Sequence, residues 1–293
     1  MDSFTIKDLE NLSGIKAHTL RVWEQRYDFL KPSRTLTKIR FYKNEELKKI
    51  LNIALLNKYG YKVSHINKMG EEEISEKILT LTQPQAQQER ILNALIQNMV
   101  DLDIDALEVT IDDYILARGI EKTINQIIFP FLQRIGILWQ TGNINPAQEH
   151  LITNVIRQKL IVGVESVQNP LNAKTTALLF LPEGEHHELG LLFMYYLLKS
   201  RGARVIYLGA NIPLKDVAYV VNVKKPDYLY CHLTTVTKSF NFEKFITSSA
   251  REFKQLKIVI SGELTRSYEK KLSPHVILKK SFGEVMDFVT SIE

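Results

Sequence analysis

The sequence has a single cysteine, Cys231, among 293 residues, so no disulfide can form within the chain. So few cysteines are typical of a reducing compartment, and we expect a cytoplasmic protein. There is no run of 18 or more apolar residues, and the N-terminus lacks the charged-then-apolar pattern of a signal peptide. We therefore expect no membrane partner. The length is enough for about two or three domains.

The charge of the chain is unevenly distributed. Residues 1–70 contain 14 Lys and Arg but only 7 Asp and Glu, a surplus of +7, whereas the whole chain carries +5. The remainder is therefore slightly acidic. This asymmetry predicts an N-terminal module that faces a polyanion.

Two short helices are predicted at the N-terminus. The first spans 5–13 with Thr5 as its N-cap, and Ser13-Gly14-Ile15 forms the turn before a second helix at about 17–27. A glycine turn between two such helices, the second rich in arginine, is typical of a helix-turn-helix. Trp23 on the second helix is interpreted as a core residue rather than a stacking residue.

A basic, hairpin-like stretch at 30–42 follows and suits a wing along the DNA backbone, before a helix at 44–59. Several motifs recur here in order: Thr19-Leu20-Arg21-x-Trp23-Glu24-x-Arg26-Tyr27, Pro32-x-Arg34-Thr35, Arg40-x-Tyr42 and the Gly60–Ile66 helix start. Over about residues 3–70 the sequence resembles the DNA-binding domain of the MerR family.

The MerR resemblance implies a dimer that binds double-stranded, pseudo-palindromic promoter DNA. We expect base contacts from the start of the second helix and phosphate contacts from its end and from the wing. The DNA-binding residues predicted are His18, Thr19, Arg21, Arg26, Tyr27, Arg34, Lys38, Arg40 and Tyr42. The alternative is a basic helical module that binds protein.

The middle of the chain is predicted to be helical. Glu71-Glu72-Glu73 and 83–88 have linker-like composition, and part of this stretch is compatible with helix. Beyond it, glycine and proline are scarce and the apolar period is helical, which predicts a four-helix bundle. Its helices are expected at 86–99, 103–116, 119–138 and 146–167, with Pro130 kinking or restarting the third.

Two histidines and two carboxylates lie together in Glu185-His186-His187-Glu188-Leu189-Gly190, between an apolar run at 176–181 and a helix-period segment. The loop therefore leaves the carboxyl end of a buried parallel strand, where open α/β sheets bind ligands. A nearby carboxylate can orient an imidazole through one ring nitrogen while the other nitrogen faces outward. The alternative is a polar loop at a sheet edge.

The C-terminal part alternates between strand and helix patterns. Strands are expected at 175–181, 204–208, 227–233, 257–261 and 275–279, and helices at 187–201, 214–224, 240–254, 264–272 and 283–292. Five strands with intervening helices predict a doubly wound, flavodoxin-like sheet of the Rossmann type.

Glu185-x-His187-x-x-Gly190 resembles the Asp-x-His-x-x-Gly signature of the cobalamin-binding fold, with Glu in place of Asp. The resemblance implies that His187 ligates cobalt from below in place of the dimethylbenzimidazole base, that Glu185 orients it, and that Gly190 lets the helix start close to the corrin. It also implies that the nucleotide tail lies near the third and fourth strands. The residues expected there are His232, Thr234, Ser261 and Gly262, while Cys231 and Ser261 depart from the Ser and Gly of that family.

Trp139, followed ten residues later by Glu149-His150, resembles the helical cap of the light-sensing, cobalamin-dependent CarH/LitR-type branch of the MerR family. The resemblance implies that Trp139 covers the upper face of the corrin and that Glu149 and His150 help to hold an adenosyl group. Gln140 follows Trp139, where the best-understood members have a histidine near the Trp that becomes the upper cobalt ligand after illumination. Without the resemblance, Trp139 is a helix-end core residue and Glu149-His150 caps a first turn.

The prediction is a multidomain protein: a winged helix-turn-helix at 1–75, a four-helix cap at 76–170 and an α/β cobalamin-binding domain at 171–293. We expect a transcriptional regulator and homo-oligomer, dimer or tetramer, in which adenosylcobalamin or methylcobalamin controls assembly and DNA binding. Light is the stimulus that the resemblance implies. The alternative is a regulator with a vestigial pocket that works in the apo form or through a protein partner. A corrinoid enzyme is disfavoured, because no segment is left to form a separate catalytic domain.

Overall fold

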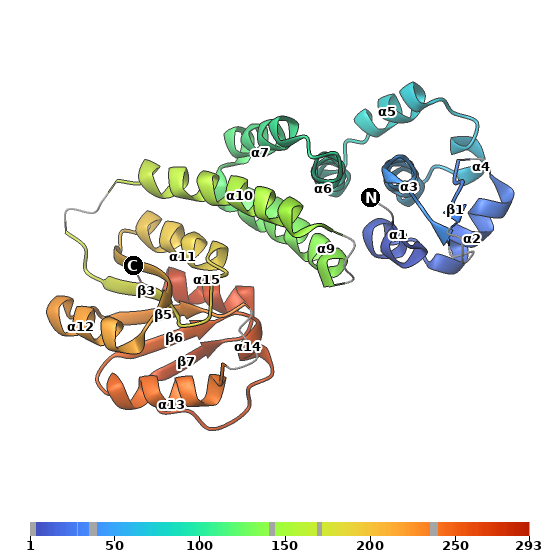
Figure 1. The fold of residues 1–293 in the computed structure, drawn as a ribbon. Helices are drawn as coiled ribbons and strands as arrows, with labels where there is room; N and C mark the ends of the chain where they lie inside the picture. Colours follow the sequence, from blue (N-terminus) through green and yellow to red (C-terminus); the bar gives the residue numbers. More distant parts are fainter. Residues whose placement is uncertain are drawn as a thin grey trace. The chain divides into compact units, whose positions relative to one another are not determined.

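The computed structural model of this chain describes residues 4–27, 29–34, 40–140, 144–168, 172–234 and 240–292, without the side chains of residues 137, 139 and 140. Its contacts form two compact units, Met1–Val155 and Ile156–Glu293. The first unit is helical apart from a short hairpin, and the second contains the large sheet (Figure 1).

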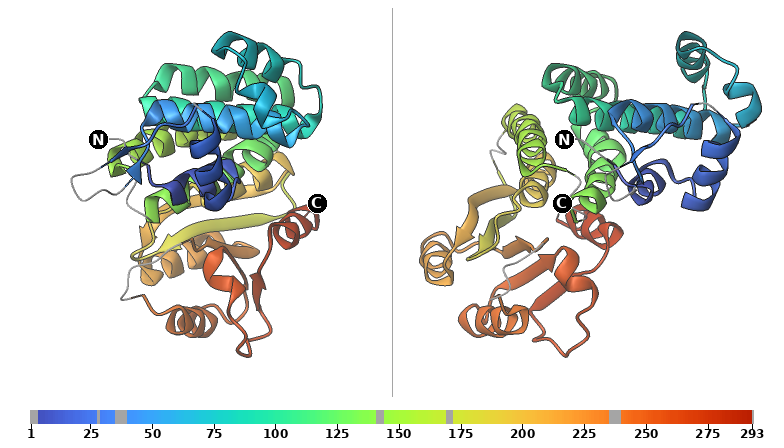
Figure 2. Two further views of the ribbon diagram at one scale, coloured as in Figure 1. Left: turned by 90° about the vertical axis from the view of Figure 1, so that its right-hand side faces the viewer. Right: turned by 45° about the vertical axis from the view of Figure 1, so that its right-hand side comes forward.

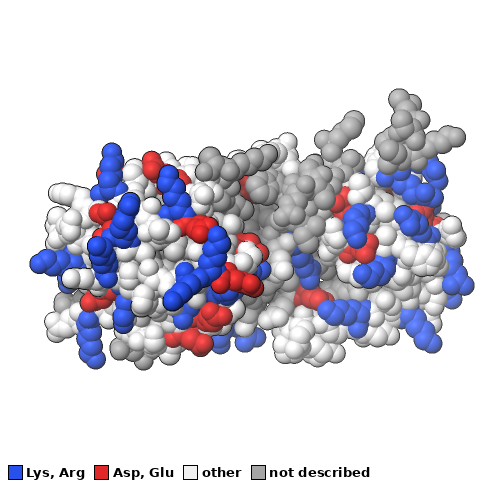
Figure 3. Space-filling view, turned by 90° about the horizontal axis from the view of Figure 1, so that it is seen from below, with Lys and Arg blue, Asp and Glu red and all other residues white. Residues whose placement is uncertain are grey.

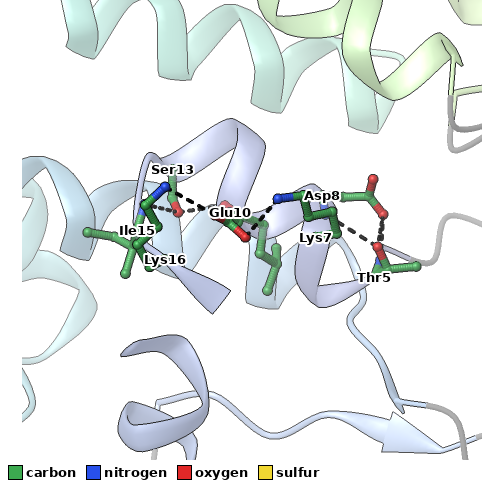
Figure 4. A network of polar contacts seen from close by, with 8 residues as sticks. Thr5, Lys7, Asp8, Glu10, Ser13, Ile15 and Lys16 are labelled. Carbon is green, nitrogen blue, oxygen red and sulfur yellow. Dashed lines mark hydrogen bonds and ion pairs between the residues drawn. The ribbon is translucent and has the colours of Figure 1, made fainter. Parts of the chain in front are cut away.

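The first unit begins with helix α1 (Ile6–Ser13), whose start shows why the predicted N-cap forms (Figure 4). The Thr5 backbone N–H donates to Asp8 Oδ2 at 2.6 Å, and the Asp8 N–H donates to Thr5 Oγ1 at 3.3 Å. This reciprocal capping box satisfies backbone donors that the first turn would otherwise leave without partners. Gly14, with φ of 74°, ends the helix, and its N–H donates to Glu10. The predicted cap and turn are thus confirmed.

Helix α2 (Ala17–Arg26) follows, and then strands β1 (Ser33–Arg34) and β2 (Arg40–Phe41) pair antiparallel. The tip of this hairpin, residues 35–39, lies outside the described residues, so the wing stays a prediction there. Trp23 is buried, with its ring edge-on to Phe29, which confirms that it is a core residue.

Helices α3 (Asn44–Lys58), α4 (Val63–Ile66) and α5 (Glu71–Leu79) continue the unit. The linker-like Glu71-Glu72-Glu73 stretch therefore opens a helix. Three carboxylates in its first turn and Lys77 in its last turn both complement the helix dipole.

The next helices follow in the predicted order and within about two residues of most predicted bounds. They are α6 (Pro84–Asp101), α7 (Ile104–Arg118), α8 (Ile120–Thr123), the π-helical turn η1 (Ile124–Ile128), α9 (Phe129–Gln140) and α10 (Pro146–Ser166). Pro130 lies just after the π-helical turn. Because proline has no N–H, it cannot bond to the preceding turn, and the irregularity expected there takes the form of η1.

Helices α3 and α6 are joined by polar contacts along their length. Lys48 Nζ lies 2.6 Å from Asp101, Asn93 Nδ2 donates to the Leu51 carbonyl at 3.3 Å, and Lys58 pairs with Glu89. The helix-turn-helix segment and the helices after it are therefore packed against each other within one unit.

The second unit contains a five-stranded parallel sheet with strand order β4-β3-β5-β6-β7, which confirms the flavodoxin-like prediction. Its strands are β3 (Thr176–Pro182), β4 (Arg204–Ile212), β5 (Tyr228–His232), β6 (Lys257–Ser261) and β7 (Val276–Lys279). Its helices are α11 (Leu189–Ser200), α12 (Leu214–Lys224), α13 (Phe242–Glu252), α14 (Glu263–Arg266) and α15 (Phe282–Thr290). The helix predicted at 264–272 is much shorter than expected.

Helices cover both faces of this sheet (Figure 1 and Figure 2). On one face, Val217 of α12 and Ile246 of α13 form a core cluster with Leu178 and Cys231. On the other face, the ring of Phe288 on α15 packs against Tyr230, and α11 packs on β3 and β4. Because strand side chains alternate between faces, neighbouring residues of β5 enter different cores.

Gly262, directly after β6, occupies a position where no other residue fits well. Its φ is +104°, and a Cβ there would lie 2.2 Å from the Leu233 carbonyl oxygen. We expect Gly262→Ala to destabilise the protein by on the order of 2–4 kcal/mol, because backbone strain and a backbone clash add. Urea denaturation of the full-length protein measures this.

Gly283→Ala is the matched control, because Gly283 lies in helix α15 of the same unit and the new Cβ would find only ordinary contact. We expect no loss of stability there, or a gain of up to about 1 kcal/mol. Equal losses in the two variants would contradict the assignment of strain to Gly262.

Candidate functional site

The loop between β3 and α11 holds a paired carboxylate and imidazole. Glu185 is fully buried, and its Oε1 lies 2.6 Å from His187 Nδ1 and accepts the His187 backbone N–H at 2.8 Å. Its Oε2 accepts the Thr234 backbone N–H at 3.1 Å, from the loop after β5. The structure thus brings Glu185, His187 and Thr234 together, although Thr234 contributes its backbone rather than its side chain to this contact.

The His187 side chain is 45% exposed, so the ring reaches the surface while Nδ1 faces the carboxylate. A carboxylate that holds one ring nitrogen fixes the ring orientation and raises the basicity of the other nitrogen, here Nε2. Across the described residues, no cluster of three or more His, Cys, Asp and Glu is suited to a bare metal ion. A single oriented imidazole of this kind fits a metal that arrives within a larger cofactor.

Strand β5 places Tyr228, Tyr230 and His232 on the α15 face of the sheet. Tyr230 packs there against Phe288, and the His232 imidazole reaches Gly190 at the start of α11. Cys231, by contrast, is fully buried in the core on the opposite face. Cys231, the residue that departs from the Ser of that family, therefore faces away from His232, because side chains alternate along a strand.

Ser261 at the end of β6 connects these side chains. Its Oγ lies 2.5 Å from the Tyr230 hydroxyl and 2.8 Å from His232 Nδ1. Ser261 and Tyr230 are buried, and burial lowers the pKa of His232 to about 4, against a smaller opposing effect of Glu185. The imidazole is therefore neutral at physiological pH.

Gly190, expected beside the corrin, and Gly262, expected beside the nucleotide tail, both have close protein neighbours. A Cβ on Gly190 would lie 2.3 Å from His232 Cδ2, and a Cβ on Gly262 would meet the Leu233 backbone. In this structure the missing side chain of Gly190 leaves space for the imidazole of His232, and its predicted role beside a corrin stays a prediction.

A second polar network, formed by Glu188, Tyr207 and Arg157, was not predicted from the sequence. Glu188 Oε1 accepts from the Tyr207 hydroxyl at 2.7 Å, and Glu188 Oε2 lies 3.4 Å from Arg157 of α10. Burial and the Glu188 contact raise the pKa of Tyr207 well above its usual value, and the Tyr195 ring stacks on it. The signal in the sequence was a second carboxylate in the histidine loop, but its partners lie 19 and 31 residues away along the chain.

The expected cap residues lie in the first unit. Glu149 accepts from the Thr153 hydroxyl at 3.4 Å, and His150, whose side chain is 75% exposed, lies 3.9 Å from Glu149. Trp139 belongs to α9, but its side chain lies outside the described residues, as does that of Gln140.

Most of the predicted DNA contacts lie at the surface of the first unit. Among the described residues, His18, Arg21, Arg26 and Arg34 are exposed, and Thr19, Tyr27 and Arg40 are half-buried. Tyr27 stacks on Phe29. Lys38 lies outside the described residues. Lys and Arg side chains are prominent along the right-hand part of Figure 3, which draws one face of the molecule.

Tyr42 is the exception among these predicted contacts. It is fully buried, and its hydroxyl donates to Glu24 at 3.3 Å, while Arg40 Nε lies 3.1 Å from the same carboxylate. Burial, with the Glu24 charge, raises the pKa of Tyr42 to about 12. We therefore correct Tyr42 from a DNA contact to a core residue that holds the hairpin against α2.

Comparison with known protein families shows what two segments of the chain are similar to. Residues 4–73 match the family described as "MerR HTH family regulatory protein", and residues 91–162 match the family described as "B12 binding domain". The chain thus contains a segment similar to a MerR-type DNA-binding domain and a segment similar to a B12-binding domain. No helix of the described residues is long and apolar enough to cross a membrane.

Two curated relatives share this organisation over nearly their whole length. The chain is 27% identical to the HTH-type transcriptional repressor CarA of Myxococcus xanthus, covering 90% of this chain and 88% of CarA. It is 24% identical to the repressor CarH of the same organism, covering 94% of each. Both relatives are repressors rather than enzymes, in agreement with the prediction of a regulator.

A solved structure is similar in fold to much of this chain. The monomethylamine corrinoid protein of Methanosarcina barkeri aligns over 70% of this chain and all of its own length, with a TM-score of 0.56 and 15% identity. At that identity the likeness concerns the fold alone.

The half-buried His232 side chain leads us to expect a pH dependence of stability. Its folded pKa of about 4 lies below the ordinary value of 6.5 for histidine, so between these values the unfolded chain binds more protons. Stability present above about pH 6.5 is therefore lost as the pH falls toward 4, by on the order of 3 kcal/mol. Urea denaturation at pH 7 and at pH 4.5 measures the loss.

His232→Asn is the matched variant, because it keeps a polar group near Ser261 but does not titrate. We expect its stability to fall much less over the same pH range. An unchanged pH dependence in this variant would assign the effect to other groups.

Proposed function

We propose that this protein is a transcriptional regulator whose DNA binding responds to a corrinoid coordinated by His187. The observation that carries the proposal is the Glu185–His187 pair, held by a buried carboxylate at the carboxyl end of β3. It lies in the same chain as a MerR-type DNA-binding segment. A sensor and a DNA-binding module in one chain are the minimum that ligand-controlled transcription requires.

The lower side of the proposed site is formed by the histidine loop. His187 Nε2 would coordinate cobalt, and Glu185 would keep the ring oriented and strengthen it as a ligand. Arg157, Glu188 and Tyr207 form a rigid polar group beside this loop, suited to amide side chains at the rim of a corrin. The bound group itself would supply a cobalt centre that can exchange a ligand.

The upper side is proposed from Trp139, Glu149 and His150 in the helical segment that matches the B12-binding family. Trp139 would cover the upper face, and Glu149 and His150 would hold an adenosyl group by hydrogen bonds. A smaller methyl group needs no such partners, so these two polar residues favour adenosylcobalamin. Release of that group by light is the stimulus that we propose.

Control of DNA binding would follow from assembly. A ligand that binds an assembled dimer or tetramer better than the free chain shifts the equilibrium toward that assembly. Several DNA-binding modules on one particle then bind neighbouring half-sites with an avidity that a single module lacks.

A second candidate is a regulator that works without a corrinoid. It is favoured by one observation: His232, Ser261 and Tyr230 fill the space where the resemblance places the nucleotide tail. The two candidates differ in a direct measurement, namely whether a corrinoid stays bound to the purified protein.

The corrinoid proposal is tested by His187→Ala. We expect the wild-type protein, mixed with adenosylcobalamin in the dark and gel-filtered, to co-elute with the corrinoid and show an altered absorption spectrum. His187→Ala should lose that spectral change because it lacks the cobalt ligand. His186→Ala is the matched control, since this exposed neighbour is not paired with Glu185. Equal retention in all three proteins would refute coordination by His187.

The DNA proposal is tested by Arg21→Ala, which removes an exposed guanidinium from helix α2. With duplex DNA selected by the wild-type protein from a random library, we expect affinity to fall about 10- to 100-fold. Binding should also lose strength steeply with salt, because phosphate contacts release counterions. Fluorescence anisotropy measures both.

Two controls sharpen this test. Arg251→Ala removes the same charge from an exposed position of α13, and Tyr42→Phe removes only a buried hydroxyl. Both should keep the affinity within about threefold of the wild type if they fold normally. A loss in Tyr42→Phe as large as in Arg21→Ala would show that the correction made for Tyr42 is wrong.

A further inference from the structure

The space between the start of α11 and the ends of β5 and β6 is filled by protein side chains. The His232 imidazole lies so close to Gly190 that even a methyl group on Gly190 would overlap three of its ring atoms, at 2.3 to 2.9 Å. Real Cβ atoms do not approach other atoms this closely. The ring is thus packed directly on the helix backbone.

The imidazole is held in place by more than packing. Its Nδ1 lies 2.8 Å from Ser261 Oγ, and the same oxygen lies 2.5 Å from the Tyr230 hydroxyl. Tyr230 is fully buried, and its ring stacks on Phe288 of α15. Moving the imidazole away would leave buried hydroxyl groups without one of their partners, which costs free energy.

This network lies on the strands next to the histidine loop. Thr234, two residues after His232, donates its backbone N–H to Glu185, and Glu185 in turn holds His187. A corrinoid ligated by His187 has had its own lower base displaced from cobalt. That base, a flat bicyclic group on a nucleotide tail, then needs a slot in the protein. The resemblance places this slot near the third and fourth strands of the sheet, at His232, Thr234, Ser261 and Gly262.

We propose that His232 is a built-in plug of this slot, so that the protein binds a corrinoid through its ring and His187 and excludes the nucleotide tail. This inference rests on the proposed corrinoid binding. It adds a selectivity: corrinoids that lack a lower nucleotide, of the cobinamide class, bind better than complete cobalamins. Ser261 is a positioning residue, since it acts by holding the imidazole.

The experiment compares two probes on the full-length protein, diaquocobinamide and hydroxocobalamin, by absorbance titration in the dark. We expect the wild type to bind cobinamide at least about tenfold more tightly. In the double variant His232→Ser with Ser261→Gly, the slot is open, and the preference should shift toward cobalamin by at least about tenfold. Cobinamide affinity should stay within about threefold, because His187 and Glu185 are untouched.

Two further variants distinguish the effect of opening the slot from a general disruption of the sheet. Cys231→Ala changes the neighbouring residue on the opposite face of β5 and should leave the preference unchanged. His232→Asn keeps a polar partner for Ser261 but is smaller than imidazole. It should shift the preference in the same direction as the double variant, so a folding defect in the double variant leaves the inference testable.

The outcomes separate this inference from the proposed function. If the wild type binds cobalamin more tightly than cobinamide, and opening the slot changes nothing, the plug is refuted while corrinoid sensing stands. If the wild type binds neither probe but the opened variant binds cobalamin, the plug is supported and corrinoid sensing by the wild type is refuted. If no folded protein in the series binds either probe, both are refuted.

Discussion

The site depends on one buried carboxylate. Glu185 has no exposed surface, yet its two oxygens accept from the His187 ring and backbone and from the Thr234 backbone. Burying a charge is costly unless hydrogen bonds replace its water, and bonds to a charged acceptor are stronger than neutral ones. Because the donors come from loops after two adjacent strands, β3 and β5, the orientation of His187 is tied to the register of the sheet. A change in that register would move the imidazole.

Local patterns were sufficient to predict most of the fold and part of the site. The Thr5 cap, the strand order and the pairing of Glu185 with His187 follow from short spacings or from alternation, which a sequence displays directly. The prediction that Tyr42 contacts DNA was wrong because a tyrosine in a basic hairpin can either contact phosphate or be buried. Only the packing of the folded chain distinguishes the two. The side of the sheet that Cys231 faces depends on the strand register, because a shift of one residue reverses the face of every side chain in a strand.

The contacts that could not be predicted join residues far apart in the chain. Glu188 contacts both Arg157 and Tyr207, and within the first unit Glu89 lies between Lys58 of α3 and Arg134 of α9. Charged residues at such separations have many candidate partners, so no spacing rule selects one. The Glu89 contacts have a consequence for regulation, because they join the DNA-binding segment to the helices that match the B12-binding family. A displacement of those helices would therefore be transmitted to α3 directly rather than through a flexible linker.

The metal-ligand part of the proposed corrinoid site and its slot for the nucleotide tail are formed by different residues. The slot can therefore be filled while the metal ligand stays in place. Coordination needs only an oriented imidazole at the end of β3, which the Glu185 contacts supply. A tail slot needs an open space between α11 and the strands, which depends on the side chains at positions 232 and 261. Filling that space with a hydrogen-bonded imidazole removes a cavity from the interior, and cavities are themselves destabilising. A filled slot therefore stabilises the fold and leaves the metal ligand unchanged. This is why His187 and His232 can occur together in one chain.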